Sequence, residues 1–127
     1  MKTSRCVLAW VAAAAVALPS AGAAATYEID PAHSTVGFRI RHLVGRVNGA
    51  FTRFSGTLSF DEKAPAKSKV EATIEAASIN TANDKRDEHL RGADFFDVAK
   101  YPSLTFTSSK VTAKGKGRYR VLGTLTM

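Results

Sequence analysis

Residues Asn83 to Thr107 read NDKRDEHLRGADFFDVAKYPSLTFT, a charged helix followed by an aromatic loop and an alternating strand. Thr81 with Asp84 three residues later is the pattern of a helix capping box. Gly92 stands where a left-handed residue commonly ends a helix. The stretch therefore predicts a short helix that begins near Asn83 and ends before Gly92.

This predicted helix is almost entirely polar. Leu90 is its only large hydrophobic residue, and a helix so short and polar is not stable in water without tertiary contacts. Three aromatic residues crowd the loop that follows it, namely Phe95, Phe96 and Tyr101. We expect these rings to anchor the helix by packing into a neighbouring apolar space.

The first 23 residues have the organisation of a secretory signal peptide. Lys2 and Arg5 precede an apolar run of 12 residues from 7 to 18, and small residues follow up to Ala25. Twelve residues cannot cross a bilayer, which needs about 20. We therefore expect a signal peptide at 1–23, with cleavage at 25 as an alternative, and a periplasmic or secreted domain at 24–127.

The composition of the exported part limits the classes of partner that we expect for it. Removing 23 of the 127 residues leaves 104, without cysteine, and with 16 basic against 11 acidic side chains the net charge falls from +7 to +5. The positive charges are spread along the chain, which suits a solvated surface or transient contact with anionic lipid. No transmembrane segment is expected after the signal peptide, and a nucleic-acid partner is not expected without a clustered basic stripe.

Period-two alternation of apolar and polar residues predicts five strands in the exported part. Strands joined by short loops favour an antiparallel sheet with one buried face. Phe51 falls out of phase with its neighbours, which suggests a bulge. The predicted strands are 33–43, 50–60, 70–76, 104–108 and 118–127, with turns or loops at 45–49, 61–68 and 113–117.

Two blocks of sequence resemble the YceI-like, polyisoprenoid-binding family of exported bacterial proteins. They are HSTVGFRIRHLVGRVNGAFTRFSGTLSFD (33–61) and SINTANDKRDEHLRGADFFDVAKYPSLTFTSSKV (78–111). The resemblance implies a mostly β fold, a lipocalin-like antiparallel barrel with a short polar helix, whose apolar pore holds a polyisoprenoid or quinone-like lipid. The family pattern continues beyond Met127 through further strands, so we expect the N-terminal part of such a domain and an incomplete barrel.

Strand parity and the resemblance together indicate the ligand-binding residues. Parity also places His42 with the inward-facing set, either near a ligand headgroup or as a hydrogen-bonded core histidine. The candidate ligand-binding residues are Val36, Phe38, Ile40, His42, Phe54, Leu58, Phe60, Ile74, Phe95, Phe96, Leu104 and Phe106. The candidate polar rim, which either meets a headgroup or fixes the helix to the barrel, comprises Arg86, Asp87, His89, Arg91 and Asp94.

The sequence does not indicate an enzyme. The three histidines lack a metal-ligand spacing, and no serine stands in a nucleophile elbow, so neither catalytic nor metal-binding residues are predicted. No cofactor other than the bound lipid is expected. We expect an exported carrier or sequestering protein for isoprenoid lipid; the alternative is a non-enzymatic structural or interaction domain whose barrel is filled by its own side chains. An unclosed barrel would also expose strand edges, which favours a homodimer or aggregation.

Overall fold

The structure is a computed structural model that describes residues 24–127, so the predicted signal peptide at 1–23 lies outside the described residues. It contains eight strands, two short 3-10 helices and one α-helix. In chain order the elements are β1 (Ala25–Glu28), β2 (Val36–His42), β3 (Gly45–Phe51), β4 (Phe54–Phe60), η1 (Pro65–Lys67), β5 (Lys69–Glu75), η2 (Ala76–Ser78), β6 (Ile79–Asn80), α1 (Asp84–Arg91), β7 (Ser103–Ala113) and β8 (Tyr119–Thr126).

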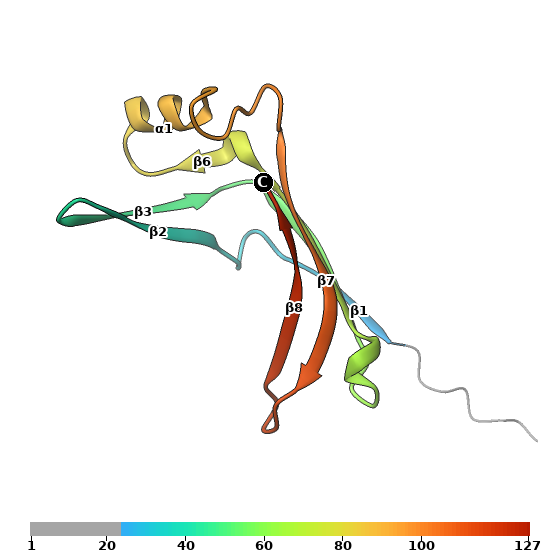
Figure 1. Ribbon diagram of the computed structural model, residues 1–127. Coiled ribbons are helices and arrows are strands. Elements are labelled where there is room, and N and C mark those ends of the chain that lie inside the picture. The colour runs from blue at the N-terminus through green and yellow to red at the C-terminus, as the bar shows by residue number, and fades with distance from the viewer. Residues whose placement is uncertain (1–23) are drawn as a thin grey trace, which may run out of the picture.

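The strands form two antiparallel sheets that splay apart from a common corner (Figure 1). The larger sheet has the order β1-β4-β5-β7-β8, and the smaller has the order β2-β3-β6. The mostly β, antiparallel fold agrees with the sequence. Within residues 24–127 the sheets do not close into a barrel, because β8 pairs with β7 alone and β2 with β3 alone.

The corner lies between the end of β3 at Phe51 and the start of β4 at Phe54. The Thr52 amide donates to the Ser78 carbonyl at 3.1 Å, and the Arg53 amide donates to Ser78 Oγ at 3.0 Å. The buried Ser78 hydroxyl thus replaces a ladder bond where the strand turns. This break explains the phase change at Phe51, so the expected continuous strand at 50–60 with a bulge is wrong: it is two strands in different sheets.

The β2–β3 hairpin is tighter than the sequence suggested. Residues 45–49 were expected to form a turn because of Gly45 and Gly49, yet they belong to β3. The register runs to the pair His42 and Gly45, which leaves only Leu43 and Val44 to turn the chain. Cross-strand pairing therefore outweighs the local turn preference of the glycines.

Two other strand boundaries also differ from expectation. The strand expected at 33–43 begins only at Val36, and the one expected at 104–108 runs from Ser103 to Ala113. The second is longer because β7 pairs with β5 over residues 103–107 and continues to pair with β8 as far as Ala113.

Helix α1 forms where the sequence placed it, but its ends differ in detail. The N-cap is Asn83, whose side chain accepts from the Arg86 amide at 2.9 Å, so the Thr81 capping box is wrong. Thr81 instead donates to the Asp87 carboxylate through its amide and its hydroxyl. Gly92 has φ −73° and ψ 172°, an extended conformation in place of the expected left-handed one.

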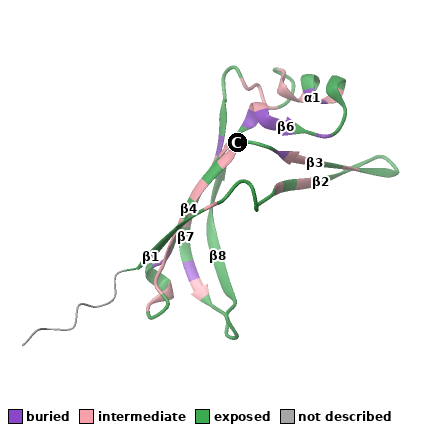
Figure 2. Cartoon of the chain, turned by 180° about the vertical axis from the view of Figure 1, so that it is seen from behind, coloured by how far each residue is buried: buried purple, intermediate pink, exposed green. Residues whose placement is uncertain are grey.

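Buried side chains gather around the corner and beneath α1 (Figure 2). The main cluster consists of Phe51, Ala76, Ile79 and Leu104, with Leu90 and Phe96 among the half-buried residues packed against it. Phe96 meets Phe51 edge to face, with ring centroids 5.8 Å apart. The expected aromatic anchor is thus confirmed for Phe96, whereas Tyr101 is 51% exposed and lies outside this core.

Candidate ligand-binding site

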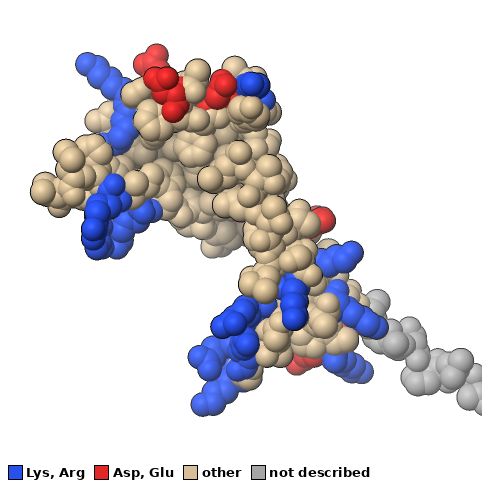
Figure 3. All heavy atoms as spheres, in the orientation of Figure 1, with Lys and Arg blue, Asp and Glu red and all other residues tan. Residues whose placement is uncertain are grey.

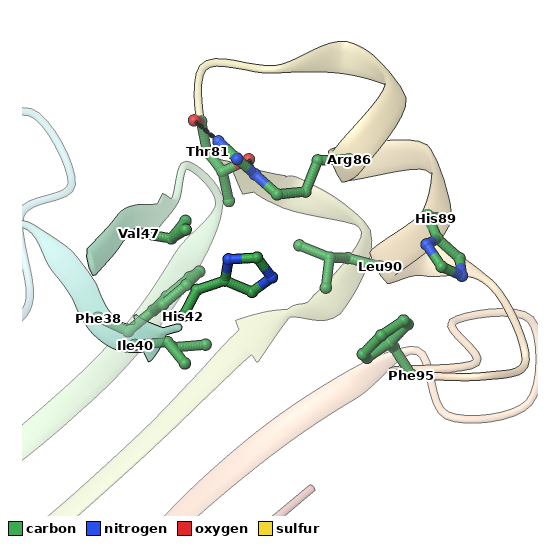
Figure 4. Close-up of a pocket in the computed structure, with 9 residues that line it drawn as sticks. All are labelled: Phe38, Ile40, His42, Val47, Thr81, Arg86, His89, Leu90 and Phe95. Carbon is green, nitrogen blue, oxygen red and sulfur yellow. Dashed lines mark hydrogen bonds between the residues drawn. The ribbon is translucent and has the colours of Figure 1, made fainter. Parts of the chain in front are cut away.

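An open apolar pocket of about 370 Å³ lies between the β2–β3 hairpin and α1 (Figure 4). The hairpin supplies its lower wall through the inward-facing side chains of β2 and β3, and the helix and the following loop supply the rest. Its lining residues are Phe38, Ile40, His42, Val47, Thr81, Arg86, His89, Leu90 and Phe95.

A second open pocket, of about 350 Å³, follows the inner face around the corner. It shares Phe38, Ile40 and Leu90 with the first pocket, so the two form one continuous surface, which we call the apolar trough. The lining of the second pocket is entirely hydrophobic: Val36, Phe38, Ile40, Phe51, Ile74, Ile79, Leu90, Phe96, Leu104, Leu125 and Met127.

Polar side chains border the trough only at the end near α1. His42, at the end of β2, directs its ring into the first pocket, and His89 and Arg86 come from α1 (Figure 4). Arg86 is held in place, because it donates to the Thr81 hydroxyl and to the Thr81 carbonyl, each at 2.8 Å. The trough is therefore apolar along most of its length and polar at one end, where Arg86 carries a positive charge.

His89 lies at the exposed edge of this polar end, beside Phe95 and Asp94. Its ring stands edge-on to Phe95 with centroids 4.9 Å apart, and its Nε2 lies 3.5 Å from the Asp94 carboxylate. The histidine side chain is 63% exposed, so it can turn its ring nitrogens toward a ligand or toward water. Asp94 itself is 82% exposed and does not line the trough.

Two residues of the expected polar rim form hydrogen bonds within the protein and do not line the trough. Asp87 is buried and accepts the two hydrogen bonds that Thr81 donates, from its amide and its hydroxyl. Arg91 donates from Nε to the Ala77 carbonyl at 2.8 Å and from Nη2 to the Ile79 carbonyl at 3.1 Å. These contacts tie α1 to the corner, which is the structural alternative that the sequence left open for this group.

Eight of the twelve candidate ligand-binding residues line the trough. The structure brings together Val36, Phe38, Ile40, His42, Ile74, Phe95, Phe96 and Leu104. These residues come from both sheets and from the loop after α1, so no single strand pattern defines the trough.

The other four candidates lie elsewhere, which corrects the expectation of one shared apolar space. Leu58 and Phe60 line a separate pocket of about 310 Å³ at the far end of the large sheet. Phe54 borders a polar depression beside the corner, and the Phe106 ring lies against Gly123 of β8. For Phe54, Leu58 and Phe60 the reason is the break between β3 and β4, because it carries the inner face of β4 away from the hairpin.

Several lining residues were not among the candidates. Val47 was missed because its segment was expected to be a turn, and Phe51 because its phase did not match the strand assigned to it. Ile79 lies on a strand of two residues, too short to show any period. The out-of-phase Phe51 was the one usable signal, since a large apolar residue that breaks a pattern often marks a change of sheet.

Two classes of feature are absent from the part of the chain that the structure describes. Within residues 24–127, no helix has the length and hydrophobicity needed to cross a membrane. Over the same residues, no group of three or more His, Cys, Asp or Glu side chains is placed to hold a metal ion.

Comparison with known proteins gives consistent matches over most of the chain. The family model of the YceI-like domain matches residues 27–127. A UPF0312 protein of Vibrio campbellii is 43% identical over 118 residues, covering 91% of this chain and 62% of the relative. Protein YceI of Escherichia coli is 50% identical over 101 residues, covering 76% of this chain and 53% of the relative.

Solved structures give the same result. BcnA of Burkholderia cenocepacia matches with a TM-score of 0.74 and 32% identity, covering 78% of this chain and 62% of that protein. The YceI protein of Campylobacter jejuni matches with a TM-score of 0.60 and 43% identity, covering 80% and 60%. The chain thus spans about three fifths of the length of these relatives, and its strands lie in the same arrangement as part of theirs.

Proposed function

Because this chain belongs to the YceI-like family, we propose that it binds a lipid with a long apolar chain, of the polyisoprenoid or quinone class, along the apolar trough. The observation that carries the proposal is the shape of the site. Two open pockets share one wall of Phe38, Ile40 and Leu90, and polar side chains border only one end. Such a surface matches a ligand that is apolar over most of its length and polar at one end.

The size and lining of the trough support this reading. Each pocket lies within the range of roughly 300–1,000 Å³ typical of small-molecule sites, and such sites are mostly hydrophobic with few polar groups. Burying one methylene group stabilises a complex by about 0.8 kcal/mol. A prenyl chain therefore gains affinity from length, without needing many hydrogen bonds.

The polar end of the trough determines which end of the proposed ligand lies beside α1. With the headgroup beside His42, Arg86 and His89, the tail runs past Ile40 and Leu90 toward the corner. The guanidinium of Arg86 and the two imidazole rings favour a headgroup with oxygen acceptors. A quinone carbonyl, an alcohol or a phosphate each meets that requirement.

The sequence and the site together support a proposed role in the cell. The signal-like residues 1–23 support a protein that acts after export, in the periplasm or outside the cell. A lipid with a long apolar chain needs a protein to cover it in an aqueous compartment, so we assign a carrier or sequestering role and no catalytic one. Since the chain spans about three fifths of its relatives, the activity of a longer protein is part of the same proposal.

Native mass spectrometry of the protein after mixing with geranylgeraniol tests the proposal. We expect a complex of one prenyl alcohol per chain, and its loss in the variant Ile40→Asp, which places a charge where both pockets meet. Leu122→Asp is the matched control, because Leu122 is 52% exposed against 54% for Ile40 and lies on the opposite face of β8 from Leu125. Absence of any retained prenyl alcohol, or equal loss in both variants, would contradict a lipid site in the trough.

A further inference from the structure

The turn of the β2–β3 hairpin exposes two large aliphatic residues. Leu43 is 86% exposed and Val44 is 108% exposed, the highest values among the large hydrophobic residues of the described chain. Two-residue hairpin turns favour Asn-Gly or Asp-Gly, because they require positive φ angles. Leu43 has φ 50°, a conformation that β-turn chemistry would assign to a smaller or more polar residue. Neither solubility nor local folding accounts for Leu and Val at this turn.

The outer face of the same hairpin is strongly basic. Arg41 lies directly opposite Arg46 in the strand register, and Arg39 lies two pairs further along on the same face, opposite Asn48. Like charges directly opposite each other destabilise a strand pair. From Pro31 to Phe60 the sequence has no acidic residue, and within residues 24–127 none of the three arginines forms a salt bridge. Lys and Arg side chains gather over the β2–β3 hairpin in Figure 3.

The inner face of the hairpin is a wall of the trough. Ile40, His42 and Val47 all line the first pocket, next to the turn. One short element therefore combines an exposed aliphatic tip, an unneutralised basic outer face and the polar end of the candidate lipid site. Such an element fits a surface that is anionic at its boundary and apolar beneath it. The aliphatic side chains can enter the apolar layer while the arginines bind the anionic groups.

We propose that the β2–β3 hairpin docks this protein onto an anionic lipid bilayer. Leu43 and Val44 enter the boundary between headgroups and acyl chains, and Arg39, Arg41 and Arg46 contact lipid phosphates. The inner face then brings the polar end of the trough to the membrane surface, where a lipid can pass between bilayer and protein. The docking stands on the hairpin alone; only the transfer of lipid rests on the proposed function.

Vesicle flotation measures the docking directly. We expect the protein to bind vesicles of phosphatidylcholine with 30% phosphatidylglycerol at low salt, and to bind vesicles of phosphatidylcholine alone much less. Replacing Arg41 and Arg46 together by glutamine should weaken binding by about 30-fold, at roughly 1 kcal/mol per cationic side chain near an anionic surface. The difference should diminish at high salt, where exposed charges are screened.

The aliphatic tip is tested by the double variant Leu43→Asn with Val44→Gly. Asparagine tolerates the positive φ of position 43 and glycine is permissive at position 44, so the fold should persist while vesicle binding falls by at least 10-fold. The charge control replaces Lys114 and Lys116 by glutamine at the β7–β8 turn, and the apolar control is Leu122→Asn. Both controls should bind vesicles as the unmodified protein does.

The outcomes separate this proposal from its alternatives. Unchanged vesicle binding in the hairpin variants, or an equal loss in the controls, would overturn the docking surface. A hairpin variant that loses self-association in light scattering while vesicle binding is absent throughout would assign the tip to a second copy of the chain instead. Retention of geranylgeraniol by the Leu43→Asn, Val44→Gly protein should be unchanged, so failure of the lipid site and failure of the docking surface give different results.

Discussion

The ring of Phe38 covers Gly49, its directly opposite partner in the β2–β3 register. A Cβ atom placed on Gly49 would lie 2.2 Å from the tip of this ring, so only glycine allows the ring its position. Phe106 also covers a glycine, Gly123 of β8, which lies opposite Ser108 in the register, and a Cβ atom there would lie 2.6 Å from the ring. In both places the absence of a side chain lets an aromatic ring lie flat against the inner face of a sheet.

The Gly49→Ala variant should therefore change the trough more than the fold. The added methyl group pushes the Phe38 ring toward the open pockets, at a cost of about 1–3 kcal/mol in the free energy of unfolding, as is typical of overpacking. Retention of geranylgeraniol in native mass spectrometry should fall, because Phe38 lines both pockets. Gly45→Ala is the matched control on the same strand, since its Cβ would meet only the His42 carbonyl at 3.7 Å.

The core at the corner predicts a large effect at Phe51. This ring is 7% exposed and contacts Phe38 and Phe96, with centroid distances of 5.6 and 5.8 Å. Phe51→Ala should lower the free energy of unfolding by about 3–5 kcal/mol in urea denaturation. Phe95→Ala removes a ring that is 56% exposed and should change stability by less than about 1 kcal/mol. Equal losses would mean that the corner is not the centre of the core.

Alternation in the sequence located most strands of the large sheet, the helix and the aromatic loop. It could not locate the corner, because a period of two says which residues share a face and not where the strand leaves one sheet for another. The corner depends on Ser78, whose carbonyl accepts hydrogen bonds from Thr52 and whose hydroxyl bonds the Arg53 backbone, 25 or more residues away in the sequence. The membership of the trough was unpredictable for the same reason, since it joins residues of both sheets.

The role of Arg91 leads to a prediction about helix α1. Its guanidinium donates to the carbonyls of Ala77 and Ile79, and hydrogen bonds that involve a charged group contribute about 1.5–3 kcal/mol. Arg91→Ala should therefore destabilise the protein by that amount and speed amide hydrogen exchange in α1 before the rest of the fold. Lys85→Ala, on the exposed side of the same helix, should leave exchange unchanged. A faster exchange spread evenly over both sheets would indicate that Arg91 supports the whole fold and not the helix.

The ion pair at the corner predicts a dependence of stability on pH. Arg53 binds Glu75 through two hydrogen bonds, Nε to Oε2 at 2.6 Å and Nη2 to Oε1 at 2.7 Å, and this contact lowers the pKa of Glu75. A carboxyl with a lowered pKa in the folded state stabilises the protein above its ordinary pKa of 4.5, and this stabilisation is lost as the pH falls through the folded-state value. The effect is small, because both side chains are about half exposed and surface pairs are screened by solvent.

The variant Glu75→Gln isolates this contribution when its thermal unfolding is compared with that of the unmodified protein. At neutral pH the variant should have a slightly lower Tm, and the two curves should converge as the pH falls from 4.5 through the lowered pKa of Glu75, where the folded protein loses this charge. The pKa of Asp30 is also lowered, by its hydrogen bond to His33, but Asp30 titrates in both proteins and cancels in the difference. Glu71→Gln removes the same charge from the same face of β5 without breaking a hydrogen bond, so it should leave the Tm at neutral pH almost unchanged. A Tm difference for Glu75→Gln that persists unchanged into acid would show that the carboxylate charge does not stabilise the corner.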